Sequence, residues 1–420
     1  MNIKTPLYSL IALVMLALTF VGCSDDDVVD VNEINQQTVI VFMPWSGTNT
    51  NSGLYSFFKQ NLDSIEGAIK TARGLSGRVV VFLSNSSTSS ELYEVTYDKG
   101  TIIHTPLKTY SGNAYNTAEG IAQILNDVQS SAYALNYSMI IGCHGTGWTY
   151  KDDWTDYPYS AKQHAGSWSL GDAAAKSATG VPAPKSYPTT RFYGSVSDMA
   201  YATDISTLAA GIQATGMKMQ YILFDDCYMA NVETAYELKD VTNFIIGSTS
   251  EIMAIGMPYQ TMWKSLATPT PAYATAVSAF DQFYSSYTYP YGGISVIDCR
   301  EVESLAAIMK EINSRYALLD SDRDSLQVLD GFHETLFYDL GDYVDHLCQN
   351  ASLLSDFRSQ LDDVVKATST TDTLYSYLYY YEEPKYIQVK TYSGITISDP
   401  SVNNVALKGR EKTGWWKATH

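Results

Sequence analysis

The sequence predicts an α/β fold with a mostly parallel central sheet, because short apolar runs rich in β-branched residues alternate with longer stretches of helical periodicity. Runs that stay apolar throughout are typical of parallel strands buried on both faces. We expect six such strands, at residues 38–43, 78–84, 137–142, 219–225, 243–249 and 292–298. The alternation favours a doubly wound sheet with helices on both sides.

Helical patterns fall between or after these runs, at residues 54–71, 117–130, 205–214, 228–239 and 301–319. The segments 91–97 and 101–106, joined across Asp98, Lys99 and Gly100, predict a hairpin inserted between two of the strand–helix units. In a C-terminal extension from about residue 370, segments 387–390 and 395–397 predict extra strands packed on one edge.

The first 22 residues predict a targeting signal that takes no part in the fold. Lys4 is the only charge before an apolar stretch at 7–22, and Cys23 follows at once, succeeded by Ser-Asp-Asp-Asp. This arrangement resembles a bacterial lipoprotein signal, which implies cleavage before Cys23, acylation of that cysteine, and export to the outer membrane or cell surface. A transmembrane anchor is the alternative, although the stretch is short for a span of about 20 residues.

Residues 23–36 are expected to form an acidic tether, and residues 37–420 are long enough for one large domain or two ordinary ones, of which we expect one domain. Removing Lys4 changes the formal charge from −18 to −19, which argues against nucleic acid or anionic lipid as a partner and is compatible with a cationic substrate. We expect a monomer. Residues 149–193 show no sustained period and are rich in Ser, Pro, Gly, Tyr and Trp, so they predict a long insertion.

Two candidate reactive side chains follow predicted strands. His144 comes after the run at 137–142, and Cys227, 83 residues later, comes after the run at 219–225. Ligands collect at the carboxyl ends of strands in open parallel sheets, so these ends are expected to present an imidazole beside a thiol. A helix beginning just after Cys227 would favour its thiolate, His144 could move the proton, and the amide of Gly145 could stabilise an oxyanion.

Two aspartates precede the thiol, and the remaining cysteines stand apart from it. If the chain stays extended, Asp225 shares a face with Cys227 and can bind a cationic side chain, whereas Asp226 points away. The alternative is that both cap the following helix, and we prefer that interpretation for Asp226. Three cysteines are expected to be buried small hydrophobic residues: Cys143, Cys299 and Cys348.

With these motifs the chain resembles the clostripain-type cysteine peptidases, relatives of caspases, legumains and gingipains. The matching stretches are His-Gly-Thr-Gly-Trp at 144–148, Asp-x-Cys-x-Met-Ala from 225, Gly-Ser-Thr-Ser-Glu at 247–251 and Gly-Met-Pro-Tyr at 256–259. The resemblance implies a caspase-like α/β/α sandwich and an endopeptidase with a His144/Cys227 dyad. It also implies cleavage of protein or peptide substrates after Arg or Lys, with Asp225 as the acidic specificity residue.

Some members of that family mature by self-cleavage between the two dyad residues. The predicted insertion offers five basic sites for such processing: Lys151, Lys162, Lys176, Lys185 and Arg191. We therefore expect a latent protein that is clipped there.

No cofactor is expected for the chemistry, and no metal site is predicted. Some relatives need calcium, but the acidic run at 320–324 lacks the glycine and the glutamate of a calcium loop, and the histidines show no zinc-ligand spacing. The alternative function is that of a catalytically silent caspase-like surface lipoprotein. Its 33 tyrosines and seven tryptophans would then serve to bind peptide or glycan.

Overall fold

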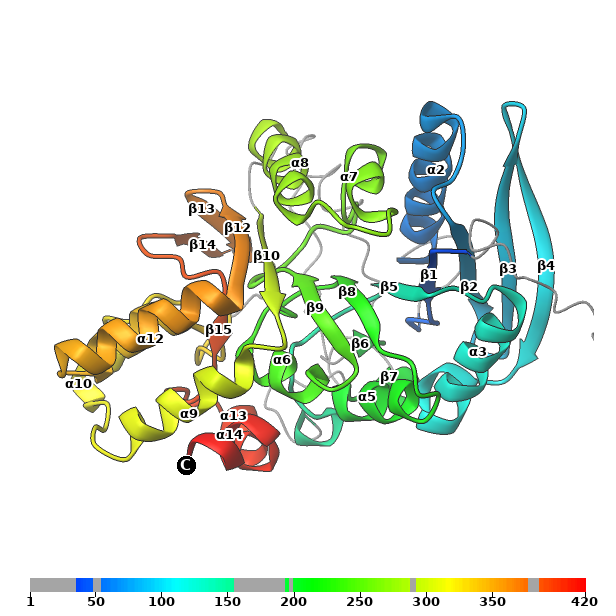
Figure 1. Cartoon of the computed structure of the whole chain (residues 1–420). Coiled ribbons are helices and arrows are strands. Elements are labelled where there is room, and N and C mark those ends of the chain that lie inside the picture. Colours follow the sequence, from blue (N-terminus) through cyan, green and yellow to red (C-terminus); the bar gives the residue numbers. More distant parts are fainter. Residues whose placement is uncertain (1–34, 48–53, 155–192, 196–198, 288–291, 377–384) are drawn as a thin grey trace, which may run out of the picture. The chain divides into compact units, whose positions relative to one another are not determined.

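A computed structural model describes residues 35–47, 54–154, 193–195, 199–287, 292–376 and 385–420 of the chain (Figure 1). The predicted signal peptide, Cys23 and most of the predicted tether lie outside these ranges. Residues 36–420 form one of two units into which the chain divides. None of the helices in the described ranges combines the length and apolar character that a membrane span requires.

The centre of this unit is a nine-stranded sheet with the order β12-β10-β9-β8-β5-β1-β2-β3-β4. Its five middle strands are parallel and correspond to five of the predicted runs: β1 (Gln37–Met43), β2 (Arg78–Ser86), β5 (Asn136–Gly142), β8 (Met219–Asp225) and β9 (Thr242–Gly247). The chain first passes from β1 to β2 and then returns to β5 on the other side of β1. This is the doubly wound order that the sequence predicts.

Antiparallel strands extend the sheet at both ends. The predicted hairpin forms β3 (Ser89–Asp98) and β4 (Thr101–Ser111), which continue the sheet beyond β2. At the other end β10 (Gly293–Asp298) runs antiparallel to β9, and β12 (Val365–Thr370) is the edge strand. The prediction of a mostly parallel sheet is thus confirmed, but β10 is buried and apolar like its parallel neighbours, so its composition does not reveal its direction.

Helices cover both faces of the sheet (Figure 1). One layer consists of α2 (Leu54–Ala72), α7 (Tyr259–Leu266) and α8 (Tyr273–Ser286), which pack in a row. The opposite layer consists of α3 (Ala118–Ser131), α5 (Ile205–Gln213), α6 (Val232–Leu238), α9 (Val302–Asn313) and α14 (Gly414–Thr419). The core lies between these layers and the sheet, where Ile40, Ile140 and Leu223 of the middle strands are fully buried.

The C-terminal extension forms extra strands, as predicted, but they do not join the central sheet. β13 (Thr373–Ser376) pairs with β14 (Lys385–Gln388), and β15 (Thr396–Ile397) pairs with β11 (Tyr338–Asp339), which precedes the extension. The edge of the central sheet is occupied instead by β12, whose partly exposed, polar residues gave no strand signal. The other helices are α10 (Asp320–Arg323), α11 (Leu340–Leu347), α12 (Ala351–Val364) and α13 (Asn404–Gly409).

The ends of the predicted insertion are ordered parts of the structure. At its start, Lys151–Trp154 form a turn of 3-10 helix (η2), and Trp148 and Trp154 are buried in a small apolar cluster. At its end, β6 (Tyr193–Gly194) pairs with β7 (Ala202–Thr203). Residues 155–192, which hold most of the insertion, lie outside the described ranges.

Candidate active site

The pairing of β5 with β8 brings His144 and Cys227 to the same place. Gly142 is opposite Asp225 in this parallel pair, and each candidate side chain follows two residues later. Beyond the strands the two segments are in close backbone contact: a Cβ added at Gly145 would lie 2.5 Å from the carbonyl oxygen of Cys227 and 3.1 Å from its amide nitrogen. Only glycine permits this approach, so the turn that follows His144 packs directly on the Cys227 backbone.

The Cys227 thiol is partly buried and contacts the segment that follows β9. The Ile252 N–H donates a hydrogen bond to Cys227 Sγ at 3.3 Å, and the thiol donates one to the Ile252 carbonyl oxygen at 3.7 Å. Burial, and then the nearby Glu251 carboxylate, raise the pKa of Cys227 well above its usual value. The resting side chain is therefore a thiol at neutral pH.

The predicted helix after Cys227 starts later than expected. Tyr228 has a positive φ of 63°, and α6 begins only at Val232 with Asn231 as its N-cap. Asn231 accepts a hydrogen bond from the Thr234 N–H at 2.7 Å and donates to the Tyr228 carbonyl oxygen at 2.7 Å. Since the field of a helix terminus falls off within about one turn, the expectation that the helix dipole lowers the pKa of Cys227 was wrong.

His144 is fixed through its backbone. Its N–H donates to the Gly194 carbonyl oxygen at 3.4 Å, and its own carbonyl oxygen accepts from the Gly194 N–H at 3.1 Å. Burial lowers the pKa of His144 to about 4, so the imidazole is neutral at pH 7. A neutral imidazole is able to accept the proton of a thiol.

The C-terminal segment supports both loops. The Thr396 N–H of β15 donates to the Ala230 carbonyl oxygen at 3.0 Å, and Trp148 Nε1 donates to Ser398 Oγ at 2.8 Å. The Ser398 N–H donates in turn to Glu233 Oε1 at 2.7 Å. One short stretch near the end of the chain thus contacts the His144 turn and the segment that follows Cys227.

Asp225 lies in a buried polar pocket beside Cys227. Its Oδ2 accepts hydrogen bonds from Tyr259 of α7 at 2.8 Å and from Asn61 of α2 at 3.2 Å. Its Oδ1 has no hydrogen-bond partner among the described residues. Gly256, with φ at 73°, lies so close that an added Cβ would be 2.5 Å from the carboxylate. Burial raises the pKa of Asp225 to about 6.

The sequence marked only part of this pocket. Gly256 and Tyr259 belong to the Gly-Met-Pro-Tyr motif, although neither was assigned to the Asp225 pocket. Asn61 gave one weak signal, an amide on a face of α2 where the neighbouring Phe58 and Leu62 are buried.

Asp226 does not cap the helix, contrary to the interpretation preferred from the sequence. The fully buried carboxylate accepts hydrogen bonds from the Cys143 backbone N–H at 2.7 Å and from its thiol at 3.3 Å. Cys143 also accepts a hydrogen bond from the Gly194 N–H at 3.2 Å, so it is more than a buried hydrophobic residue. Cys299 and Cys348 are buried, as expected. Asp226 therefore ties the Cys227 segment to the residue before His144.

Of the five candidate processing residues, the structure describes Lys151. It lies in η2, and its backbone N–H donates to Asp204 Oδ1 at 2.9 Å. The other four lie outside the described residues: Lys162, Lys176, Lys185 and Arg191. Within the described part of the chain, no group of three or more His, Cys, Asp or Glu side chains is placed to hold a metal ion.

Comparisons with known proteins give one matching family model and several similar solved structures. The family model of the C11 peptidases, the clostripain family, matches residues 168–404. Iotapain, a secreted C11 cysteine protease from Bacteroides thetaiotaomicron, is 41% identical, with a TM-score of 0.80 over 92% of this chain and 99% of that chain. A search of curated protein sequences gives no match.

Two further solved structures are similar to parts or all of the chain. A clostripain from Bacteroides thetaiotaomicron, in complex with the peptide inhibitor BTN-VLTK-AOMK, is 48% identical over 53% of this chain and 97% of that chain, with a TM-score of 0.51. An inactive zymogen C11 protease from Parabacteroides distasonis is 23% identical, with a TM-score of 0.70 over 92% of this chain and 99% of that chain. At the latter identity the likeness is one of fold alone.

Because burial raises the pKa of Asp225, we expect its ionisation to lower the free energy of unfolding as pH rises. Between about pH 4 and pH 6 the folded protein retains a proton that the unfolded chain releases, so the free energy of unfolding falls as pH rises. At pH 7 this cost is on the order of 3 kcal/mol. In a Cys227→Ala background, we expect Asp225→Asn to gain stability relative to its parent as pH rises from 4 to 7, measured by urea unfolding.

His144, with its lowered pKa, has the opposite pH dependence, but it is present in both proteins and cancels from the difference. The matched control is Asp356→Asn, at an exposed position of α12, for which the difference should stay flat. A difference between Asp225→Asn and its parent that is equally flat would contradict the pKa assigned to Asp225.

Proposed function

Because the chain belongs to the clostripain family and is therefore a cysteine peptidase, we propose that Cys227 is its nucleophile and His144 its general acid and base. The observation that carries this proposal is the contact between the two strand ends, where the Gly145 turn packs on the Cys227 backbone. Both side chains are neutral at rest, so the proton has to move as the substrate reacts.

In the first half of the reaction, Cys227 Sγ attacks the carbonyl carbon of the scissile bond while its proton passes to His144. The new S–C bond forms as the carbonyl electron pair moves onto oxygen, and the backbone N–H of Gly145 stabilises the resulting oxyanion. When the oxyanion collapses, the C–N bond breaks. The imidazolium then gives its proton to the departing amine.

In the second half, water attacks the thioester. His144 takes a proton from the water, the C–S bond breaks, and the thiol is restored as the carboxylic acid product leaves. These steps use side chains and backbone of this chain alone, with neither a cofactor nor calcium taking part.

Asp225 is the proposed specificity residue for lysine or arginine before the scissile bond. Its buried carboxylate has an unpartnered Oδ1 among the described residues, and a cationic side chain supplies the missing partner and favours the charged form of Asp225. The inhibitor peptide of the 48% identical clostripain, VLTK, ends in lysine, which supports the same preference for this chain. Substrates are then proteins or peptides with basic residues.

No specific observation favours the alternative function, that of a catalytically silent binding protein. The chain is a cysteine peptidase by family, and His144, Cys227 and Asp225 lie together at one edge of the sheet. A silent relative would have no reason to keep the close glycine contact between the two strand ends.

We also propose that the enzyme is made latent and is activated by self-cleavage in the insertion. In support, the Cys227 thiol is engaged by the Ile252 backbone, and both backbone groups of His144 pair with Gly194, at the end of the insertion. Cutting the insertion releases the chain next to that pair. Cleavage after Lys151 would require the η2 turn to unwind, which favours the other four basic residues.

For localisation we propose an exported lipoprotein that is acylated at Cys23 and held at the outer membrane or cell surface. Support comes from the signal pattern around Cys23 and from iotapain, which is described as secreted. The tether before the folded unit would then separate the enzyme from the membrane.

Substitution of the two reactive residues tests the mechanism. We expect Cys227→Ala and His144→Ala each to lower kcat/KM by about a thousandfold or more on a short peptide with lysine before a fluorogenic amide. Cys299→Ala, which removes a buried thiol elsewhere in the core, should retain nearly full activity. Equal residual activity in wild type and Cys227→Ala would refute the proposal.

Substitution of Asp225 tests specificity. Asp225→Asn should lower kcat/KM about a hundredfold for a lysine substrate and change it little for the matched glutamine substrate, because it leaves the bound ammonium without a charged partner. In the wild type, kcat/KM for lysine should fall as pH drops below about 6, where Asp225 protonates. An equal fall in kcat/KM for the glutamine substrate would contradict the specificity role of Asp225.

Self-cleavage is read directly on a denaturing gel. The purified mature chain should convert into two fragments as its activity rises, whereas Cys227→Ala should remain a single chain. Replacing the four basic residues from Lys162 to Arg191 by glutamine should block the conversion, while Lys151→Gln alone should not. An uncut wild-type chain with full activity would exclude latency of this kind.

Metabolic labelling with a radioactive fatty acid tests the lipid anchor. Wild type expressed in a Gram-negative host should carry label and partition into detergent, and Cys23→Ser should lose both properties. Label on the Cys23→Ser variant, or none on the wild type, would contradict acylation at this position.

A further inference from the structure

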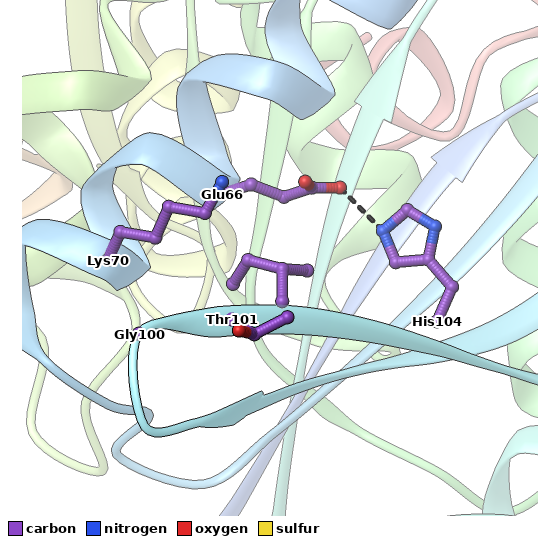
Figure 2. A pocket seen from close by; sticks show the side chains of 6 residues that line it. Glu66, Lys70, Gly100, Thr101 and His104 are labelled. Atoms are coloured by element: carbon purple, nitrogen blue, oxygen red, sulfur yellow. Dashed lines mark hydrogen bonds and ion pairs between the residues drawn. The ribbon is translucent and has the colours of Figure 1, made fainter.

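A cavity of about 300 Å³ lies between helix α2 and the β3–β4 hairpin, away from the proposed active site. Apolar and charged side chains both line it, among them Leu62, Asp63 and Glu66 of α2 and Leu83, Glu91 and Tyr93 of the sheet. Glu66 and His104, which form a hydrogen bond of 2.7 Å, also line a second hollow with Lys70, Gly100 and Thr101 (Figure 2).

The end of this cavity that Leu83 and Glu91 line belongs to the same row of paired residues across the sheet as Asp225. Glu91 is opposite Leu83, Leu83 is opposite Met43, and Gly142 is opposite Asp225. Phe42 pairs with Ile141, so the next residues, Met43 and Gly142, also lie side by side and complete this row of residues. Four strand spacings separate Glu91 from Asp225, or about 19 Å.

Helix α2 stands between the two pockets and contributes to both. Asn61 donates to Asp225 on one flank, and its neighbours Leu62 and Asp63 line the cavity on the other. A peptide lying along this edge of the sheet reaches both pockets.

The cavity offers the groups that bind a long cationic side chain. Leu62, Leu83 and Leu92 provide apolar surface for an aliphatic stem. Tyr93 also lines the cavity, is 8% exposed and packs its ring against His104, and its hydroxyl makes no hydrogen bond among the described residues.

Three carboxylates line the cavity with Tyr93: those of Glu91, Glu66 and Asp63, of which Glu66 is paired with His104. After burial, Glu91, Glu66 and then Asp63 are among the causes that raise the pKa of Tyr93. Glu91 is held in place because Asn85 Nδ2 donates to its Oε1 at 3.2 Å, and Tyr55 donates to Asn85 Oδ1 at 2.9 Å. The local potential at the hydroxyl is therefore negative.

Two lysines also line the cavity and do not reverse this potential. Lys108 Nζ lies 2.6 Å from Asp127, so its charge is already paired. Lys59 is exposed on α2 and points its charge toward solvent at the rim.

We propose that this cavity is an accessory subsite for a second lysine or arginine side chain of the substrate, about six residues from the scissile bond. The aliphatic stem lies on the leucines, and the cationic head is bound by the carboxylates and the Tyr93 hydroxyl. The inference rests on the proposed peptidase function. It makes the enzyme prefer substrates with two spaced basic residues over substrates with one.

The test compares kcat/KM for peptides that share one cleavable lysine. One pair of peptides carries lysine or glutamine six residues before that position, and another pair carries the same choice six residues after it. In the wild type we expect one of the two lysine peptides to be preferred about three- to fivefold over its glutamine partner, and the preference to disappear near 1 M salt.

Four charge variants test whether the cavity residues cause this preference. Glu91→Gln and Asp63→Asn should reduce it, whereas Lys59→Gln should increase it. Glu119→Gln, an equal change of charge at an exposed position of α3 in the opposite helix layer, should leave it unchanged. All four variants should cleave a short peptide with a single lysine at the wild-type rate, which shows that the active site is intact.

Three outcomes would overturn the subsite: equal turnover of the lysine and glutamine peptides at both positions, a preference that survives in Glu91→Gln and Asp63→Asn, or a reduced preference in Lys59→Gln. If the wild type fails to cleave even the short peptide, the proposed function fails instead. The subsite is then tested by fluorescence anisotropy of the same labelled peptides with Cys227→Ala, where the lysine peptide should again bind more tightly.

Discussion

The contact between the Gly145 turn and the Cys227 backbone is the constraint on which the rest of the site depends. Parallel strands β5 and β8 bring two segments to the same level, but a side chain at position 145 would hold them apart. Because this distance is set by backbone against backbone, it does not depend on the rotamers of the His144 and Cys227 side chains. The imidazole and the thiol can then stay neutral and partly buried without losing their relative placement.

The two adjacent acids before the thiol show how strand geometry separates functions in neighbouring residues. Asp225 faces the α2 and α7 layer, where its carboxylate meets Tyr259 and Asn61, while Asp226 meets Cys143 of the adjoining segment. Both are buried, and burial alone disfavours the charged form of each. Hydrogen bonds from Tyr259 and Asn61 offset part of this cost at Asp225, and those from the Cys143 N–H and S–H do so at Asp226.

Much of this arrangement could be predicted from the sequence, since uniformly apolar runs indicate buried strands and each candidate residue, His144 and Cys227, comes two residues after such a run ends. The prediction failed where a local sequence pattern is compatible with two different structures. Residues 228–231 have helical composition, but the positive φ at Tyr228 and the Asn231 cap delay the helix. The polar, half-exposed β12 and the direction of β10 depend on partners that lie far away in the sequence. Asn61 became part of the site only through the packing of α2 on the sheet.

The bonds from β15 to Ala230 and from Ser398 to Trp148 have a consequence for the order of events during synthesis. Both loops are translated before residues 396–398. The hydrogen bonds from this segment can therefore form only after the His144 turn and the segment that follows Cys227 have both been made.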